Sequence, residues 1–249
     1  MNKEQLGDRM KSNYENITRN YLPRRTNTII RLDGKAFHNF TKGFDRPFDM
    51  EFIKVMNLTA RYLCENIQGC KMAYVQSDEI SLLLTDYDNL KTDAWFGGNI
   101  QKIVSISASM ATAYFNSIIK DFKPNVDTLG MFDSRVFTIS DDEEVVNYFV
   151  WRQKDWERNS IQLMGQSIFS HKELHKKSCN EIQEMCFQKG INWNDYAIFL
   201  KRGRTVIYKD NEWVIDNAMP IITHDRDYIK SLMIKNYNKG ELNDRSING

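Results

Sequence analysis

The feature that most constrains the fold is a pair of apolar runs, residues 71–76 and 80–85, separated only by residues 77–79. Each run has the length and the β-branched, aromatic and apolar content of a strand. So short a connection between two strands leaves room only for an antiparallel hairpin. Residues 26–32 form another β-branched, apolar run and predict a further buried strand.

Two helices are predicted between these strands. Asp49 is a suitable N-cap for a helix whose apolar residues recur every three or four positions, with Gly69 at its C′ position. A second helix should follow Gly97-Gly98, and residues 135–139 are typical of a strand. The order strand, helix, hairpin, helix, strand predicts an α+β fold: a polymerase-palm-like βαββαβ antiparallel sheet with both helices on one face.

Residues 140–249 are expected to form a helical extension with short strands, packed as one unit on a palm-like core of residues 1–139. Capping boxes at Ser140 and Ser170 predict two helix starts, and the second helix should run to Gly190. The other expected elements are a polar helix over residues 3–20, short strands around 197–200, 205–208 and 213–215, and a loose tail over 236–249.

The charge balance limits the kinds of partner. Lysine and arginine number 34 against 33 aspartate and glutamate residues, so contact with nucleic acid must come from local patches. No run of 18 apolar residues is present, and the polar N-terminal segment lacks the apolar core of a signal peptide. These features predict a cytoplasmic protein with no membrane partner. The four cysteines lack zinc-binding spacing and are expected to be free thiols.

Acidic residues occur at the expected ends of the central strands. Asp33 ends the first strand, and Asp78 lies in the hairpin turn with Glu79 beside it. The βαββαβ layout places the first strand beside the hairpin, so Asp33 and Asp78 should be neighbours. Close carboxylates repel each other, and a cation between them removes that cost. Oxygen ligands favour Mg²⁺ or Mn²⁺, and two such ions can clamp the attacking and leaving oxygens of a displacement at phosphorus.

Gly34 follows Asp33 and would let the backbone approach a ligand closely, so that its carbonyl could bind a metal. The alternative that these acidic segments are ordinary turns stays open on spacing alone. Basic side chains and backbone amides nearby suit a triphosphate. The candidates for phosphate contacts are Arg31, Lys35, Ala36, Phe37, His38, Arg46 and Lys102.

A basic surface for RNA is predicted further along the chain, although a solvated charged face explains the same residues equally well. Its members are Lys172, Lys176, Lys177, Arg202 and Arg204. Trp151 and Trp156 are expected to be core or subunit contacts rather than stacking platforms.

Four segments also match a known family, in the same order and at sensible spacing. Residues 31–40 (RLDGKAFHNF) resemble the first signature of the tRNA-histidine guanylyltransferase superfamily, and residues 74–79 (YVQSDE) resemble the second. Residues 132–136 (FDSRV) and 151–155 (WRQKD) are similar to two further signatures.

The resemblance implies a polymerase-related palm that adds nucleotides in the reverse, 3′-to-5′, direction to the 5′ end of a tRNA. It implies two magnesium ions bound by Asp33 and Asp78, one of them also by the Gly34 carbonyl. Glu79, which follows Asp78, is predicted as a further catalytic acid. Residues 33–38 and 77–78, including Ser77, would bind the incoming nucleoside triphosphate. Family members activate a 5′-monophosphate with ATP or GTP, or begin from a 5′-triphosphate. They also resemble tetramers built as dimers of dimers.

One departure from the family pattern concerns the choice of tRNA. The histidine-specific branch carries a His-Ile-Asn-Asn-Leu-Tyr-Asn segment where residues 157–163 read ERNSIQL, with only Asn159 kept. This change favours the guanylyltransferase-like branch, which resembles repair enzymes that rebuild truncated tRNA 5′ ends on the opposite strand as template. A strict tRNA-histidine guanylyltransferase, a nucleotidyl cyclase and a non-catalytic RNA-binding module remain the alternatives. Arg46 replaces a common lysine and keeps the charge.

Overall fold

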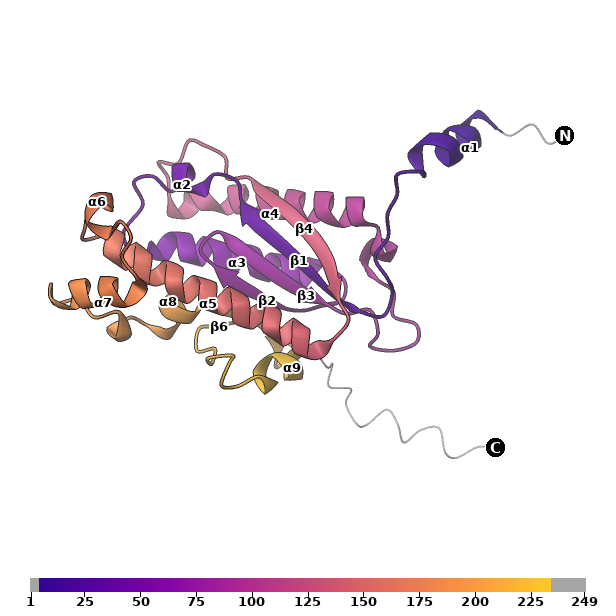
Figure 1. The fold of residues 1–249 in the computed structure, drawn as a ribbon. Helices are drawn as coiled ribbons and strands as arrows, with labels where there is room; N and C mark the ends of the chain where they lie inside the picture. The colour runs from indigo at the N-terminus through magenta and orange to yellow at the C-terminus, as the bar shows by residue number, and fades with distance from the viewer. Residues whose placement is uncertain (1–4, 234–249) are drawn as a thin grey trace.

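The computed structural model describes residues 5–233, which are built around a six-stranded antiparallel sheet (Figure 1). The strand order β4-β1-β3-β2-β5-β6 places the hairpin strands β2 and β3 beside β1, and β1 beside β4. This arrangement confirms the predicted palm-like α+β fold, and the last two strands extend it beyond β2. The strands are β1 (Asn27–Gly34), β2 (Cys70–Gln76), β3 (Glu79–Leu84), β4 (Phe132–Ile139), β5 (Arg204–Lys209) and β6 (Glu212–Asp216).

Long helices cover both faces of the sheet (Figure 1). Ile30 of β1 packs with α3 and α4, whereas its neighbour Ile29 packs with α5 and α9, because successive side chains of a strand point to opposite faces. The two predicted helices therefore share one face, and the later part of the chain covers the other. The longer helices are α3 (Met50–Asn66), α4 (Ile100–Phe122), α5 (Asp142–Gln166), α7 (Cys179–Phe187) and α9 (Asp227–Met233). The shorter ones are α1 (Leu6–Met10), η1 (Lys11–Glu15), α2 (Phe37–Phe40), η2 (Trp95–Gly98), α6 (His171–Leu174), η3 (Trp193–Asp195) and α8 (Ile198–Arg202).

The N-cap residues explain which of the predicted helix boundaries were correct and which were wrong. Asp49 caps α3 as predicted, but α5 is capped by Asp141 rather than Ser140. Ser170 does form a capping box, yet α6 ends after four residues and a second capping box at Ser178 opens α7. The single helix predicted from Ser170 to Gly190 is therefore two helices.

Three further expectations differ from the structure. Residues 197–200, predicted as a strand, fall largely in α8. Gly69 lies two residues beyond the C-cap Ile67 instead of at C′. Of the polar helix predicted over residues 3–20, the described part from residue 5 onward contains α1 and η1, which bury no residue. The predicted loose tail over 236–249 lies outside the described residues. No helix between residues 5 and 233 is long and apolar enough to cross a membrane.

Arg204 begins β5 and is fully buried, so its predicted contact with RNA was wrong. Its Nε donates to Asn57 Oδ1 over 2.9 Å, while Nη1 and Nη2 have no partner within residues 5–233. Burial lowers the pKa of Arg204 to about 10, because the charged form has lost its hydration without gaining an acid.

We expect Arg204→Met to leave stability unchanged or to raise the free energy of unfolding by about 1–3 kcal/mol. The substitution removes two unsatisfied donors and a buried charge, and it keeps an apolar chain of similar length. Urea denaturation measures the change, with Arg202→Met as a control of the same type at a half-buried position. A loss of more than about 2 kcal/mol would contradict the view that this guanidinium is poorly satisfied.

Candidate active site

The register of the sheet places the acidic residues together. Asp33 pairs with Glu79 across β1 and β3, and Asp78 lies in the turn immediately before β3. The turn is tight enough to hold Ser77 at a φ of 44°. Asp33 and Asp78 both line one hollow of about 470 Å³, called the α5 hollow here because α5 supplies much of its wall. The structure therefore brings together the two carboxylates that the sequence predicted to be neighbours.

The electrostatics of this pair are unfavourable without a cation. Burial raises the pKa of the Asp78 carboxyl to about 6, and repulsion by Asp33 and Glu79 adds to the rise, while a hydrogen bond from Ser77 opposes it. The Asp33 carboxylate forms an ion pair with a side chain, because its Oδ2 lies 3.3 Å from Arg31 Nη2. A carboxyl that resists ionisation inside an open hollow is typical of functional sites.

The raised pKa of Asp78 predicts how stability depends on pH in the absence of metal. Between about pH 4 and pH 6 the folded state binds more protons at Asp78 than the unfolded state, so the free energy of unfolding falls as pH rises. Above this window the ionised carboxyl is a constant cost, which Asp78→Asn removes. In EDTA we expect Asp78→Asn to melt at a higher temperature than the parent protein at about pH 8, with the difference disappearing near pH 4. Equal melting temperatures at both pH values would contradict this account.

Gly34 leaves no room for a side chain beside Asp78. A Cβ at Gly34 would lie 2.3 Å from Phe37 Cδ2 and 2.6 Å from Asp78 Oδ2. The Gly34 backbone therefore lies directly against the Asp78 carboxylate, which only glycine permits. Among residues 5–233 no cluster of three or more Asp, Glu, His or Cys side chains could hold a metal. Two carboxylates and a backbone oxygen nevertheless fit magnesium, which keeps several waters and completes its shell with substrate phosphates.

Glu79, predicted among the catalytic acids, is engaged elsewhere. Its two oxygens accept hydrogen bonds of 2.7 and 2.6 Å from Nε and Nη2 of Arg152, and Arg31 Nε lies 3.3 Å from Oε2. Both Glu79 and Arg152 are buried. Glu79 therefore anchors the start of β3 next to Asp78; it also lines the α5 hollow, and its catalytic role stays a prediction. Arg152 was missed as a functional residue because its partner is 73 positions away and nothing local marks the pair.

A second hollow of about 510 Å³ is called the α2 hollow here, and it shares Ser77, Asp78, Leu163 and Gln166 with the first. Most of the residues predicted to contact phosphate line it, namely Gly34, Ala36, Phe37, His38 and Arg46. Arg31 lines the α5 hollow instead. Lys35 lines neither hollow, and its amide donates to the Met131 carbonyl over 2.8 Å, so this amide is not available to a phosphate.

Lys102 lies near the other end of the sheet. Its neighbour Ile103 shares a small hollow with Thr28, near the start of β1, whereas Asp33 is at the end of that strand. The five residues from Thr28 to Asp33 span about 16 Å of extended chain. The Lys102 ammonium lies 5.8 Å from the centre of the Phe96 ring. A direct contact between Lys102 and a nucleotide at Asp33 was therefore a wrong prediction.

The other RNA candidates do not share one helix face. Lys172, Lys176 and Lys177 are exposed, but they belong to α6 and the turn that follows it. Lys177 forms a 3.0 Å ion pair with Glu181. Trp156 is buried as expected, whereas Trp151 is 52% exposed and lines the α5 hollow. Of the two roles expected for Trp151, a place in the core is therefore excluded and a subunit contact stays a prediction.

The palm-like sheet, the paired carboxylates and the adjoining hollows together are the arrangement of a nucleotidyltransferase. Residues 7–140 match the family model described as tRNAHis guanylyltransferase (Thg1), which is more than half of the chain. The chain belongs to this family, as the four signatures implied.

Named relatives agree with this assignment. The chain is 31% identical over 216 residues to the tRNA(His) guanylyltransferase of Schizosaccharomyces pombe, covering 80% of each chain. It is similar to the solved structure of a bacterial tRNA(His) guanylyltransferase (Thg1)-like protein in complex with ATP, with a TM-score of 0.87, 44% identity, and 92% of this chain and 99% of that one covered. A complex of a bacterial Thg1-like protein with GTP matches with a TM-score of 0.79, 41% identity and the same coverage.

Proposed function

We propose that this protein adds nucleotides in the 3′-to-5′ direction to the 5′ end of truncated tRNA, with the opposite strand of the acceptor stem as template. The observation that carries the proposal is the placement of Asp33, Asp78 and Gly34 where two hollows adjoin. Both hollows have the size of small-molecule sites. The α2 hollow suits the incoming nucleoside triphosphate, and the α5 hollow is left for the end of the RNA.

Asp33, Asp78 and the Gly34 carbonyl would hold two Mg²⁺ ions, which supply positive charge at the reacting phosphate and favour ionisation of the attacking hydroxyl. Mn²⁺ offers the same chemistry. Gly34, Ala36, Phe37, His38 and Arg46 line the α2 hollow, and in this proposal they bind the triphosphate and orient the nucleotide. The hydroxyl proton is lost, the 3′-oxygen of this nucleotide bonds to the α-phosphorus of the RNA 5′-triphosphate, and pyrophosphate leaves; at a 5′-monophosphate that has first been nucleotidylated, the same attack expels AMP or GMP. The first activation of a 5′-monophosphate uses ATP or GTP.

Two observations favour repair over strict recognition of tRNA-histidine. Residues 157–163 lack most of the histidine-branch segment. The bacterial structures at 44% and 41% identity carry the name of guanylyltransferase-like proteins, and their complexes with ATP and GTP support nucleotide binding here. We also infer a homotetramer, a dimer of dimers, from the family resemblance.

The proposal is tested with a tRNA that lacks its first 5′ nucleotide and carries a 5′-triphosphate. Magnesium and each nucleoside triphosphate are added separately, beside full-length tRNA-histidine, and extension of the 5′ end is followed on a gel. We expect addition of only the nucleotide that complements the opposing base. Guanylate added solely to tRNA-histidine would favour a strict guanylyltransferase, and cyclic nucleotide without extension would favour a cyclase.

A further inference from the structure

Trp151 presents a half-open ring in the hollow that contains Asp33 and Asp78. Its side chain is 52% exposed, although covering so large an apolar surface would be favourable. The Arg152 guanidinium lies 4.5 Å from the ring centre, and Tyr148 packs edge-on at 5.9 Å. These buried neighbours hold the indole in place while part of its surface stays free. A fixed, half-open indole is a platform for another flat ring.

The face of α5 that carries Trp151 continues as a row of polar side chains along the same hollow. Asp155, Asn159, Gln162 and Gln166 follow at spacings of three or four residues, which places them on one side of the helix. Within residues 5–233, Gln162 and Gln166 make no hydrogen bond with their side chains, and both are exposed. From Trp151 to Gln166 the row is about 22 Å long, much longer than one nucleobase.

The chemistry of this row suits bases better than phosphates. The row contains amides and an acid but no lysine or arginine. Two arginines, Arg31 and Arg152, line the same hollow, but both are already paired with Glu79, so they offer little free charge to a phosphate backbone. Side-chain amides carry both donors and acceptors, which match the edges of bases. Recognition of single-stranded RNA ends commonly combines a base stacked on an aromatic ring with hydrogen bonds to the base edge.

We propose that Trp151 stacks on the terminal base of the RNA 5′ end, with the amide row of α5 facing the adjoining bases. The inference rests on the proposed function, because it assigns the α5 hollow to RNA once the α2 hollow holds the nucleoside triphosphate. The recognised chemistry is a nucleobase, which a free nucleotide also carries. The length of the row favours RNA, and the experiment separates the two sources.

The test compares the binding of truncated tRNA and of free ATP to the full chain and to three variants. Trp151→Leu removes the platform, Trp151→Phe keeps a smaller ring, and Phe187→Leu is the control. Phe187 is 61% exposed on α7 and lines neither hollow. We expect Trp151→Leu to weaken RNA binding about tenfold and Trp151→Phe about threefold, with unchanged binding of ATP. Melting temperatures should stay close to that of the parent protein because the ring is half exposed.

Unchanged RNA affinity in a folded Trp151→Leu variant would overturn the inference. So would weaker binding of ATP alone, which would make the ring a free-nucleotide platform. Binding is measured without extension, so the two proposals fail separately. RNA binding that depends on Trp151, without any 5′ extension, would sink the proposed function and keep the platform. Templated extension together with RNA binding that is unchanged in Trp151→Leu would support the proposed function and overturn the platform.

Discussion

Asp78→Ala is expected to lower the rate of nucleotide addition by roughly a thousandfold or more and to leave the protein folded. The carboxylate is the group that a metal ion would bind, and among residues 5–233 no lysine, arginine or histidine forms an ion pair with it; Ser77 supplies a hydrogen bond. Its pKa is raised to about 6 by burial and by Asp33, so its removal relieves a cost of folding. Asp33→Ala should have a similar effect on the rate. Single-turnover extension and thermal melting measure the two quantities separately.

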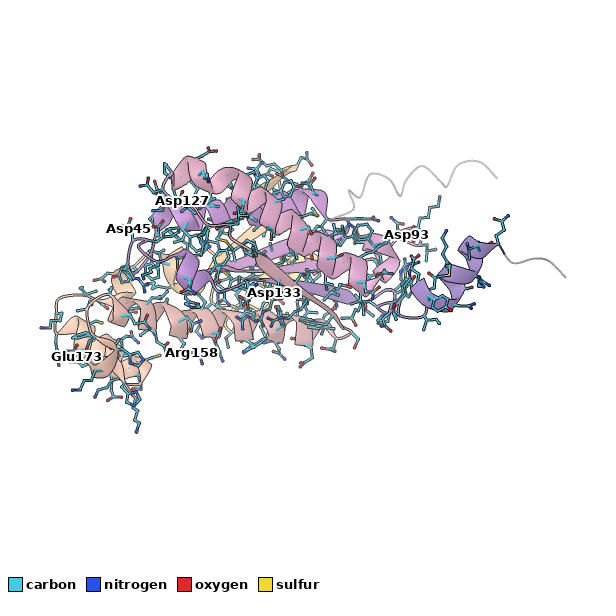
Figure 2. All side chains as sticks on the ribbon, turned by 90° about the horizontal axis from the view of Figure 1, so that it is seen from above. Asp45, Asp93, Asp127, Asp133, Arg158 and Glu173 are labelled. Carbon is cyan, nitrogen blue, oxygen red and sulfur yellow. The ribbon has the colours of Figure 1, made fainter. Side chains whose placement is uncertain are left out.

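A matched control lies on the neighbouring strand. Figure 2 shows Asp133 on β4, where it pairs in register with Asp33. Its side chain is 55% exposed and lines neither hollow. We expect Asp133→Ala to retain near-normal extension. If Asp78→Ala also kept near-normal activity, the metal assignment would be wrong.

Arg152→Met is expected to cause a large loss of stability, about 3–5 kcal/mol in the free energy of unfolding. Among residues 5–233, the substitution leaves the buried Glu79 carboxylate with the 3.3 Å contact to Arg31 as its cationic partner and a 3.3 Å hydrogen bond donated by Ser81 Oγ. Extension should also slow, because Glu79 begins β3 next to the turn that carries Asp78. Urea denaturation gives the stability change, and extension at a temperature where the variant is folded gives the rate.

Arg158 provides the control for this prediction on the same helix (Figure 2). Its side chain is 59% exposed and its ion pair is with Asp155. Exposed ion pairs contribute little to the free energy of unfolding, so Arg158→Met should change it by less than about 1 kcal/mol. Similar losses in both variants would show that the buried bridge has no special role.

The features that could be predicted from sequence depend on neighbouring residues. The hairpin followed from the short connection at residues 77–79, and Asp49 was recognised as a cap because its partner is the Phe52 amide, three residues away. The predicted strand order, with the first strand beside the hairpin, was enough to predict that Asp33 and Asp78 are neighbours. Capping boxes are local as well, but Ser170 gave no sign that its helix would stop before a second one at Ser178.

The features that could not be predicted depend on tertiary contacts. Arg204 has the charge of an RNA ligand, and only the packing of β5 beneath α3 shows that it is buried against Asn57. The pairing of Glu79 with Arg152 joins segments 73 residues apart. The sequence did not decide whether Trp151 lies in the core or at a subunit contact, because exposure is set by which face of α5 meets the sheet. Burial and long-range pairing therefore decide what a charged or aromatic residue can do.

The most direct test of the central claim changes the template. Four truncated tRNAs that differ only in the acceptor-strand base opposite the missing 5′ nucleotide are given a 5′-triphosphate and incubated with magnesium and all four nucleoside triphosphates. Sequencing of the extended 5′ ends identifies the nucleotide added. The proposed function predicts that the added nucleotide follows the opposing base in all four RNAs. Addition of guanylate regardless of that base, or no addition to any of them, would contradict it.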